Sequence, residues 1–135
     1  MKKIVQIICL GVVLAWTSFG FSNFESISQI EGTWVGQVDE NNCIFPSMAK
    51  FITLDNIVTG IIREVGSWSS ETCTPSSYYV NVFGEGFIKT DSETIIFPKE
   101  GGFIEFQLSD DGNTLTGKAY FSGKLYSKYE LFRDK

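Results

Sequence analysis

Short runs of β-forming residues fill the chain from Glu31 onward, with turn residues between them at intervals of roughly eight to twelve positions. No part of this region repeats its apolar residues with the period of a helix. The pattern therefore predicts an all-β domain of about eight strands, over residues 32–39, 48–54, 57–65, 78–89, 94–98, 103–108, 114–121 and 125–133.

The connections between these runs are too short for parallel pairing. Asp55-Asn56 is a two-residue polar joint, and the segment 109–113 carries the Asp-Gly signal of a tight hairpin. Parallel neighbours would require crossovers of roughly a dozen residues or more, and the chain has no room for them. We expect an antiparallel up-and-down meander, and about eight such strands predict a small closed barrel.

The first 22 residues have the layout of a secretory signal peptide. Lys2 and Lys3 precede an apolar run from Ile4 to Trp16, and small residues follow at Gly20 and Ser22. The run is shorter than the roughly 20 apolar residues that span a bilayer, which disfavours the alternative of an uncleaved anchor. We therefore expect an exported protein, periplasmic or secreted, in which residues 23–135 form one domain.

Cleavage at this point would leave two cysteines, Cys43 and Cys73. In an oxidising compartment they are expected to form one structural disulfide, since no Cys-x-x-Cys spacing suggests a redox pair. Each lies in a segment predicted as a long loop, residues 39–46 and 66–77. In a meander both loops fall at the same end of the sheet, so the disulfide is expected to tie them over one mouth of the barrel, where a ligand or partner would be met.

Charge and residue types exclude several functions. The chain has a net charge of -5, and removal of the leader leaves nine basic and sixteen acidic residues, which disfavours binding to nucleic acid or anionic lipid. It contains no histidine, so the commonest general base and metal ligand is missing. We predict no catalytic residue, no metal site and no cofactor, and expect Glu85 and Glu105 to face solvent rather than act as buried acids.

Aromatic residues are the strongest lead to a binding function. Alternation along the strands turns Phe106, Phe121 and Tyr129 inward, while Phe83 lies in a strand with apolar residues on both faces. These four side chains predict either a filled core or an apolar pocket for one small ligand, because an eight-stranded barrel allows both. Trp68, in the third-to-fourth loop, is expected at the mouth, where it could contact a ligand or a partner.

Gly32-Thr33-Trp34 on the first strand and residues 129–133 on the last resemble the calycin superfamily, which includes lipocalins, fatty-acid-binding proteins and avidin-like barrels. The resemblance implies that Trp34 packs beneath Arg133 at the closed end, with Gly32 beside them, as structural residues. The early Gly-x-Trp followed by one disulfide is also similar to bacterial barrels that inhibit secreted metalloproteases.

These observations predict a non-enzymatic exported barrel that binds a small apolar or amphipathic ligand. The alternative is a protein-binding module, such as a secreted protease inhibitor, that acts through the disulfide-tied loops. An enzyme that uses Glu and Tyr as acid and base would require convergent polar groups inside the barrel.

Overall fold

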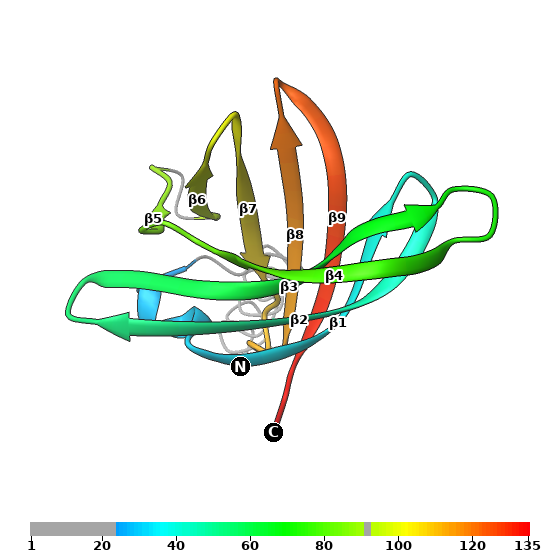
Figure 1. The fold of residues 1–135 in the computed structure, drawn as a ribbon. Coiled ribbons are helices and arrows are strands. Elements are labelled where there is room, and N and C mark those ends of the chain that lie inside the picture. The colour runs from blue at the N-terminus through cyan, green and yellow to red at the C-terminus, as the bar shows by residue number, and fades with distance from the viewer. Residues whose placement is uncertain (1–23, 91–92) are drawn as a thin grey trace, which may run out of the picture.

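The computed structural model describes residues 24–90 and 93–135, so the predicted signal peptide, residues 1–22, lies outside the described residues. The domain is all-β: nine antiparallel strands form one sheet, and one 3-10 helix, η1 (Ile27–Ile30), precedes them (Figure 1). The strands are β1 (Gly32–Glu40), β2 (Cys43–Leu54), β3 (Ile57–Ser69), β4 (Thr74–Val82), β5 (Phe87–Ile88), β6 (Ile95–Lys99), β7 (Gly102–Leu108), β8 (Thr114–Phe121) and β9 (Lys124–Arg133).

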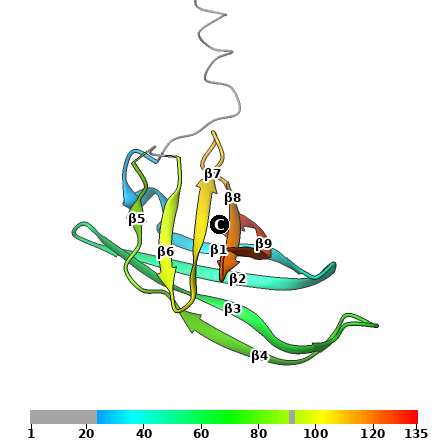
Figure 2. The same cartoon turned by 90° about the horizontal axis from the view of Figure 1, so that it is seen from above.

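Sheet order confirms the predicted up-and-down topology. The order is β4-β3-β2-β1-β9-β8-β7-β6-β5, so neighbours in the sheet are neighbours in the chain except where β1 pairs with β9. Strands β1 to β4 run across the direction of β6 to β9 (Figures 1 and 2). The apolar faces of the two halves enclose one core.

That core is densely aromatic. Along β2, buried and exposed residues alternate from Cys43 to Phe51, which is the pattern of a strand with one face inward. Phe51, Phe83, Phe97 and Phe106 lie with ring centroids 4.8 to 6.2 Å apart in stacked, tilted and edge-on arrangements. This part of the interior is therefore filled with side chains.

One short contact joins β3, which lies next to the end strand β4, to the segment that leads into the other end strand, β5. Val58 of β3 forms an antiparallel bridge with Gly86, and Gly86 N donates to Val58 O at 2.9 Å. Phe83 N also donates to Gly60 O, at 2.8 Å. Strand pairing does not continue beyond this short contact in the described chain, so the structure shows a strongly curved sheet and does not by itself establish the predicted barrel closure.

Both predicted loops are shorter than expected. Residues 39–46 form a tight hairpin: Asn41 and Asn42 have φ of 50° and 66°, and β2 already begins at Cys43. Asparagine tolerates this left-handed conformation, and two such residues in succession suit a two-residue hairpin turn. Residues 66–77 belong mostly to the β3–β4 hairpin, with only 70–73 between the strands.

The predicted strand 78–89 is also corrected. It is divided into β4 and the short β5, which gives nine strands instead of eight. Tyr79 lies opposite Glu64 of β3, whereas Val80 and Val82 face outward and are exposed. Beyond Val82 the chain leaves the β4 register, and Phe83 turns into the aromatic core. The apolar residues of this segment thus lie in two environments: Val80 and Val82 are exposed to solvent, and Phe83 is in the core.

Trp34 closes one end of the core. Its indole is fully buried, and Nε1 donates to Ile30 O of η1 at 2.8 Å. The Arg133 guanidinium lies 4.2 Å from the Trp34 ring centroid, so the contact implied by the resemblance is present. Gly32 has φ of 126°, and a Cβ there would lie 3.2 Å from Arg133 Nη1, so a side chain would be both strained and crowded. We call Trp34, Arg133 and η1 the floor.

Candidate functional site

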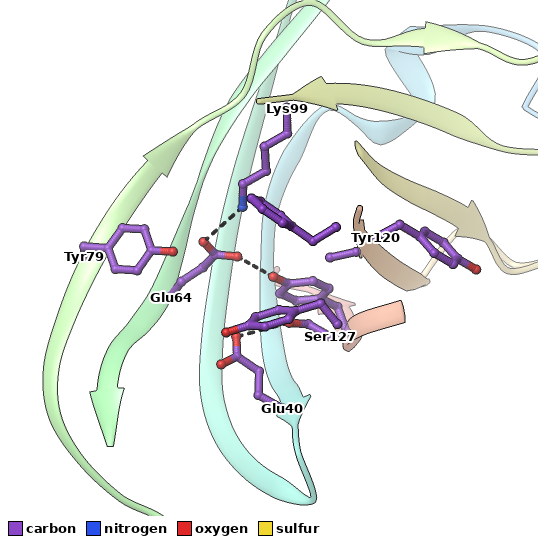
Figure 3. A pocket seen from close by; sticks show the side chains of 10 residues that line it. Glu40, Glu64, Tyr79, Lys99, Tyr120 and Ser127 are labelled. Atoms are coloured by element: carbon purple, nitrogen blue, oxygen red, sulfur yellow. Dashed lines mark hydrogen bonds and ion pairs between the residues drawn. The ribbon is translucent and has the colours of Figure 1, made fainter. Parts of the chain in front are cut away.

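A pocket of about 280 Å³ lies at the end of the sheet opposite the floor. Trp34 is near the start of β1, whereas Glu40 of the pocket is its last residue; along β9, Ser127 lies in the pocket and Arg133 in the floor. Six strands supply the lining, which consists of Glu40, Glu64, Tyr79, Lys99, Ala119, Tyr120, Phe121, Tyr126, Ser127 and Tyr129 (Figure 3). We call this the mouth pocket.

Glu64 is the centre of its polar part. The residue is only 3% exposed, because it follows Ile62 on the inward face of β3. Tyr129 Oη donates a short hydrogen bond to Oε1, Asn81 Nδ2 donates to Oε2 at 3.3 Å, and Lys99 Nζ lies 3.8 Å from Oε2. Tyr79 points toward the same carboxylate (Figure 3). Glu64 is thus a buried acid with partners on three other strands.

Glu40 is the second buried acid and is 4% exposed. Ser127 Oγ donates to its Oε1 at 3.2 Å, and no other described residue donates a hydrogen bond to this carboxylate. Burial raises the pKa of Glu40 above the ordinary value of 4.5, the Ser127 hydrogen bond lowers it, nearby Glu64 raises it and Lys99 lowers it. In the folded protein the charged form of Glu40 is therefore destabilised relative to its neutral form.

Tyr129, which is buried, and Tyr79, which is 48% exposed, both direct their hydroxyl groups toward Glu64 (Figure 3). Burial raises the pKa of Tyr129, and the negative charge of Glu64 raises it further. Burial likewise raises the pKa of Tyr79, followed by its hydrogen bond to Glu64. Both phenols thus keep their proton in the physiological pH range, and each hydroxyl can donate a hydrogen bond to a carboxylate or to a ligand.

A β-bulge shapes the apolar side of the pocket. Ala119 of β8 pairs with Ser127, but the next residue, Tyr120, pairs with Leu125, so β9 carries Tyr126 as an extra residue. Bulges redirect side chains, and Tyr126 here lines the pocket. Phe121 is 49% exposed and forms part of the rim, while Tyr120 points away from the carboxylates (Figure 3).

The five side chains predicted to bind ligand separate into three environments. Tyr129 and Phe121 line the mouth pocket. Phe83 and Phe106 lie in the filled aromatic core and do not line it. Trp68 lies on β3 toward the β3–β4 turn, 5.6 Å from Phe45 between ring centroids, and its Nε1 is buried without a hydrogen-bond partner in the described chain.

The predicted disulfide is present between Cys43 and Cys73, with Cα atoms 5.3 Å apart. Because Cys43 opens β2 and Cys73 lies in the β3–β4 turn, the bond joins two hairpins instead of two long loops. Glu40 is the strand partner of Cys43, so the bond lies beside the mouth pocket.

Glu40, Glu64 and Lys99 are pocket residues that the sequence patterns did not single out. Of the two glutamates considered from the sequence, Glu85 is exposed and Glu105 is half-buried. A signal for Glu64 did exist, because Val58, Gly60, Ile62 and Glu64 share the inward face of one strand. Within residues 24–90 and 93–135, no group of three or more acidic or cysteine side chains could hold a metal ion, and no helix is long and apolar enough to cross a membrane.

Replacing Glu40 with Gln is expected to raise the free energy of unfolding at about pH 7, because the neutral amide keeps the Ser127 contact without a buried charge. The raised pKa fixes the sign: wild-type stability falls as pH rises from the unfolded-state pKa through the higher folded-state pKa. Below the unfolded-state value, Glu40 is protonated in both states and the gain should vanish. Glu64 and Lys99 are the charged groups that face it.

Urea unfolding of both proteins at about pH 7 and about pH 3.5 measures this difference. Glu130→Gln, at an exposed position of β9, is the control and should change stability little at either pH. An equal loss of stability at both pH values in Glu40→Gln would contradict the prediction.

Comparison of the chain with protein-family models, with curated proteins and with solved structures found no match. The chemistry of the mouth pocket is therefore the basis for assigning a function.

Proposed function

We propose that the protein is an exported, non-enzymatic calycin-like β-barrel that binds a small amphipathic ligand in the mouth pocket. The observation that carries this proposal is the composition of the pocket wall. The lining combines the buried carboxylates of Glu40 and Glu64 and tyrosine hydroxyls with apolar surface from Ala119, Phe121 and Tyr126. Such a combination of apolar walls with a few convergent polar groups is typical of small-molecule sites.

The barrel part of the proposal rests on two features. The Val58–Gly86 bridge brings β3 beside the segment that leads into β5, so the ends of the sheet order approach each other. At the opposite end, Gly32, Trp34 and Arg133 have the arrangement that the resemblance to calycins implies. Export is supported by the Cys43–Cys73 disulfide, since such bonds persist mainly in oxidising compartments.

The filled core limits the size of the ligand. Phe51, Phe83, Phe97 and Phe106 occupy the space behind the pocket, so a long acyl chain cannot extend toward the floor without moving them. The volume of about 280 Å³ lies just below the range for ligand sites, which is roughly 300 to 1,000 Å³. A compact molecule with one apolar body and one polar group matches these dimensions.

Binding can be tested with three probes that share a phenethyl body: 2-phenylethylammonium, 2-phenylethanol and 3-phenylpropanoate. We expect at least one of them to perturb the NMR signals of Tyr126 and Ser127. Ala119→Phe should abolish that binding, because the new ring would occupy the pocket that Ala119 lines. Thr116→Phe is the matched control, since it adds a ring at an exposed position on the same strand.

Failure of all three probes to bind, together with native mass spectrometry of protein from its own host that detects no bound small molecule, would overturn the proposed function. Binding that persists at full strength in Ala119→Phe would place the site elsewhere and would contradict the assignment to the mouth pocket.

Recognition of another exported protein through the disulfide-tied hairpins is the second candidate. It is favoured by Ile44, which is 57% exposed next to Cys43. A protease inhibitor of this kind should lose its target when Ile44 is replaced by Asp, while the phenethyl probes bind as before. Inhibition of no exported protease, and capture of no exported protein that depends on Ile44, would remove this candidate.

A further inference from the structure

We propose that the polar group of the ligand is an organic ammonium ion, bound between Glu40 and Glu64 in the mouth pocket. This inference rests on the proposed function and specifies the ligand class of the same site. It predicts that the pocket selects small amphipathic amines over alcohols and carboxylates of the same shape.

The balance of charge in the pocket is the first argument. Two carboxylates and one ammonium group, that of Lys99, line it. Both glutamates are more than nine-tenths buried, whereas the Lys99 side chain is 29% exposed and lies at the edge of the pair. With both acids ionised, the pocket lacks one positive charge, and a bound cation would supply it.

Unused hydrogen-bonding capacity at Glu40 is the second argument. Oε1 accepts from Ser127, but no described residue donates to Oε2. Glu64, in contrast, accepts from Tyr129 and Asn81 and pairs with Lys99. Glu40 Oε2 is not among the buried atoms that lack a partner, so it is open to a ligand, and an ammonium group has three N–H donors to offer it. Because Glu40 itself lines the pocket, a ligand in the pocket can reach this oxygen.

The surrounding rings favour the same ligand class. Phe121, Tyr126 and Tyr79 line the pocket and provide aromatic surface for an apolar body. Aromatic faces attract cations and do not attract carboxylates. An anionic ligand would find the one cationic side chain of the lining, Lys99, already paired with Glu64, and would lie close to two like charges.

The three phenethyl probes separate the possibilities. At about pH 8, where a free aliphatic amine is protonated and the probe 3-phenylpropanoate is ionised, we expect 2-phenylethylammonium to bind about tenfold more tightly than 2-phenylethanol. The carboxylate 3-phenylpropanoate should bind more weakly than the alcohol. Isothermal titration calorimetry or NMR titration gives the three dissociation constants.

Two substitutions should change the affinity for the amine in opposite directions. Glu40→Gln should weaken binding of the amine about tenfold and leave binding of the alcohol unchanged, because only the charged acceptor is lost. Lys99→Gln removes a like charge and should strengthen binding of the amine, whereas a site for anions would be weakened by the same change. Glu130→Gln, an exposed carboxylate on the outer side of β9, is the matched control for non-specific attraction.

Equal or tighter binding of the carboxylate, or weaker binding of the amine in Lys99→Gln, would overturn the inference and leave the proposed function intact. Absence of binding by every probe would overturn the inference, and together with native mass spectrometry that detects no bound small molecule it would overturn the proposed function as well. Circular dichroism and unfolding curves of each variant establish that the comparison is made between folded proteins.

Discussion

Replacement of Arg133 with alanine is expected to lower the free energy of unfolding by about 3 kcal/mol and to leave binding at the mouth pocket unchanged. The guanidinium donates to Gly112 O at 3.1 Å, to Glu31 O at 2.8 Å and to Gln29 O at 2.9 Å, and it covers the Trp34 ring. Alanine would remove all of these contacts and uncover the indole. The affected residues all belong to the floor or its surroundings.

Arg63→Ala is the matched control for this experiment. Arg63 also lies over an aromatic ring, that of Tyr78, at 4.3 Å from the centroid, but both residues are exposed. We expect its replacement to change stability by about 1 kcal/mol or less. Urea unfolding with the phenethyl probes titrated in parallel measures both effects. An unchanged unfolding midpoint in urea for Arg133→Ala would remove the main support for the calycin-like interpretation.

Loss of the disulfide should lower the free energy of unfolding by as much as Arg133→Ala or by more. The double substitution Cys43→Ala and Cys73→Ala opens a loop defined by a sequence separation of 30. In the chain-entropy model, a bond that closes such a loop stabilises the fold by roughly 3 to 4 kcal/mol. Alanine is the appropriate replacement because Cys43 is buried and a hydroxyl there would require a new partner.

Reduced wild-type protein provides the control, since it loses the bond and keeps both sulfur atoms. Its unfolding midpoint in urea should fall close to that of the double variant, and both should lie well below the oxidised protein. If all three midpoints agree, the bond does not constrain the unfolded chain in the way that the entropy model requires.

Local patterns predicted much of the architecture. Alternation located most of the strands, and the polar joints at Asp55-Asn56 and at residues 109–113 indicated hairpins, so the antiparallel order followed from connection length. The errors occurred where a turn signal was overlooked or ambiguous. Asn41-Asn42 is a two-residue turn without glycine, and the segment after Val82 changes partner without a break in its apolar composition.

The mouth pocket was harder to predict because its polar groups are distant in sequence. Glu40 and Ser127 are separated by 87 positions, and Glu64 and Tyr129 by 65. A single glutamate in a strand is most often exposed. The pairing of β1 with β9 sets Glu40 opposite Ser127, and Glu64 reaches the same end of the sheet from β3. The extra residue Tyr126 in β9 leaves no distinctive pattern in the sequence, since a bulge depends on the partner strand.

The position of the disulfide has a mechanical consequence. Glu40 lies on the β1–β2 hairpin and Glu64 on the β3–β4 hairpin, and the Cys43–Cys73 bond joins these two hairpins. Electrostatic repulsion between the two carboxylates acts to spread the hairpins apart, and the covalent bond opposes that force beside Glu40. The cross-link therefore limits how far the two hairpins that carry these like charges can separate.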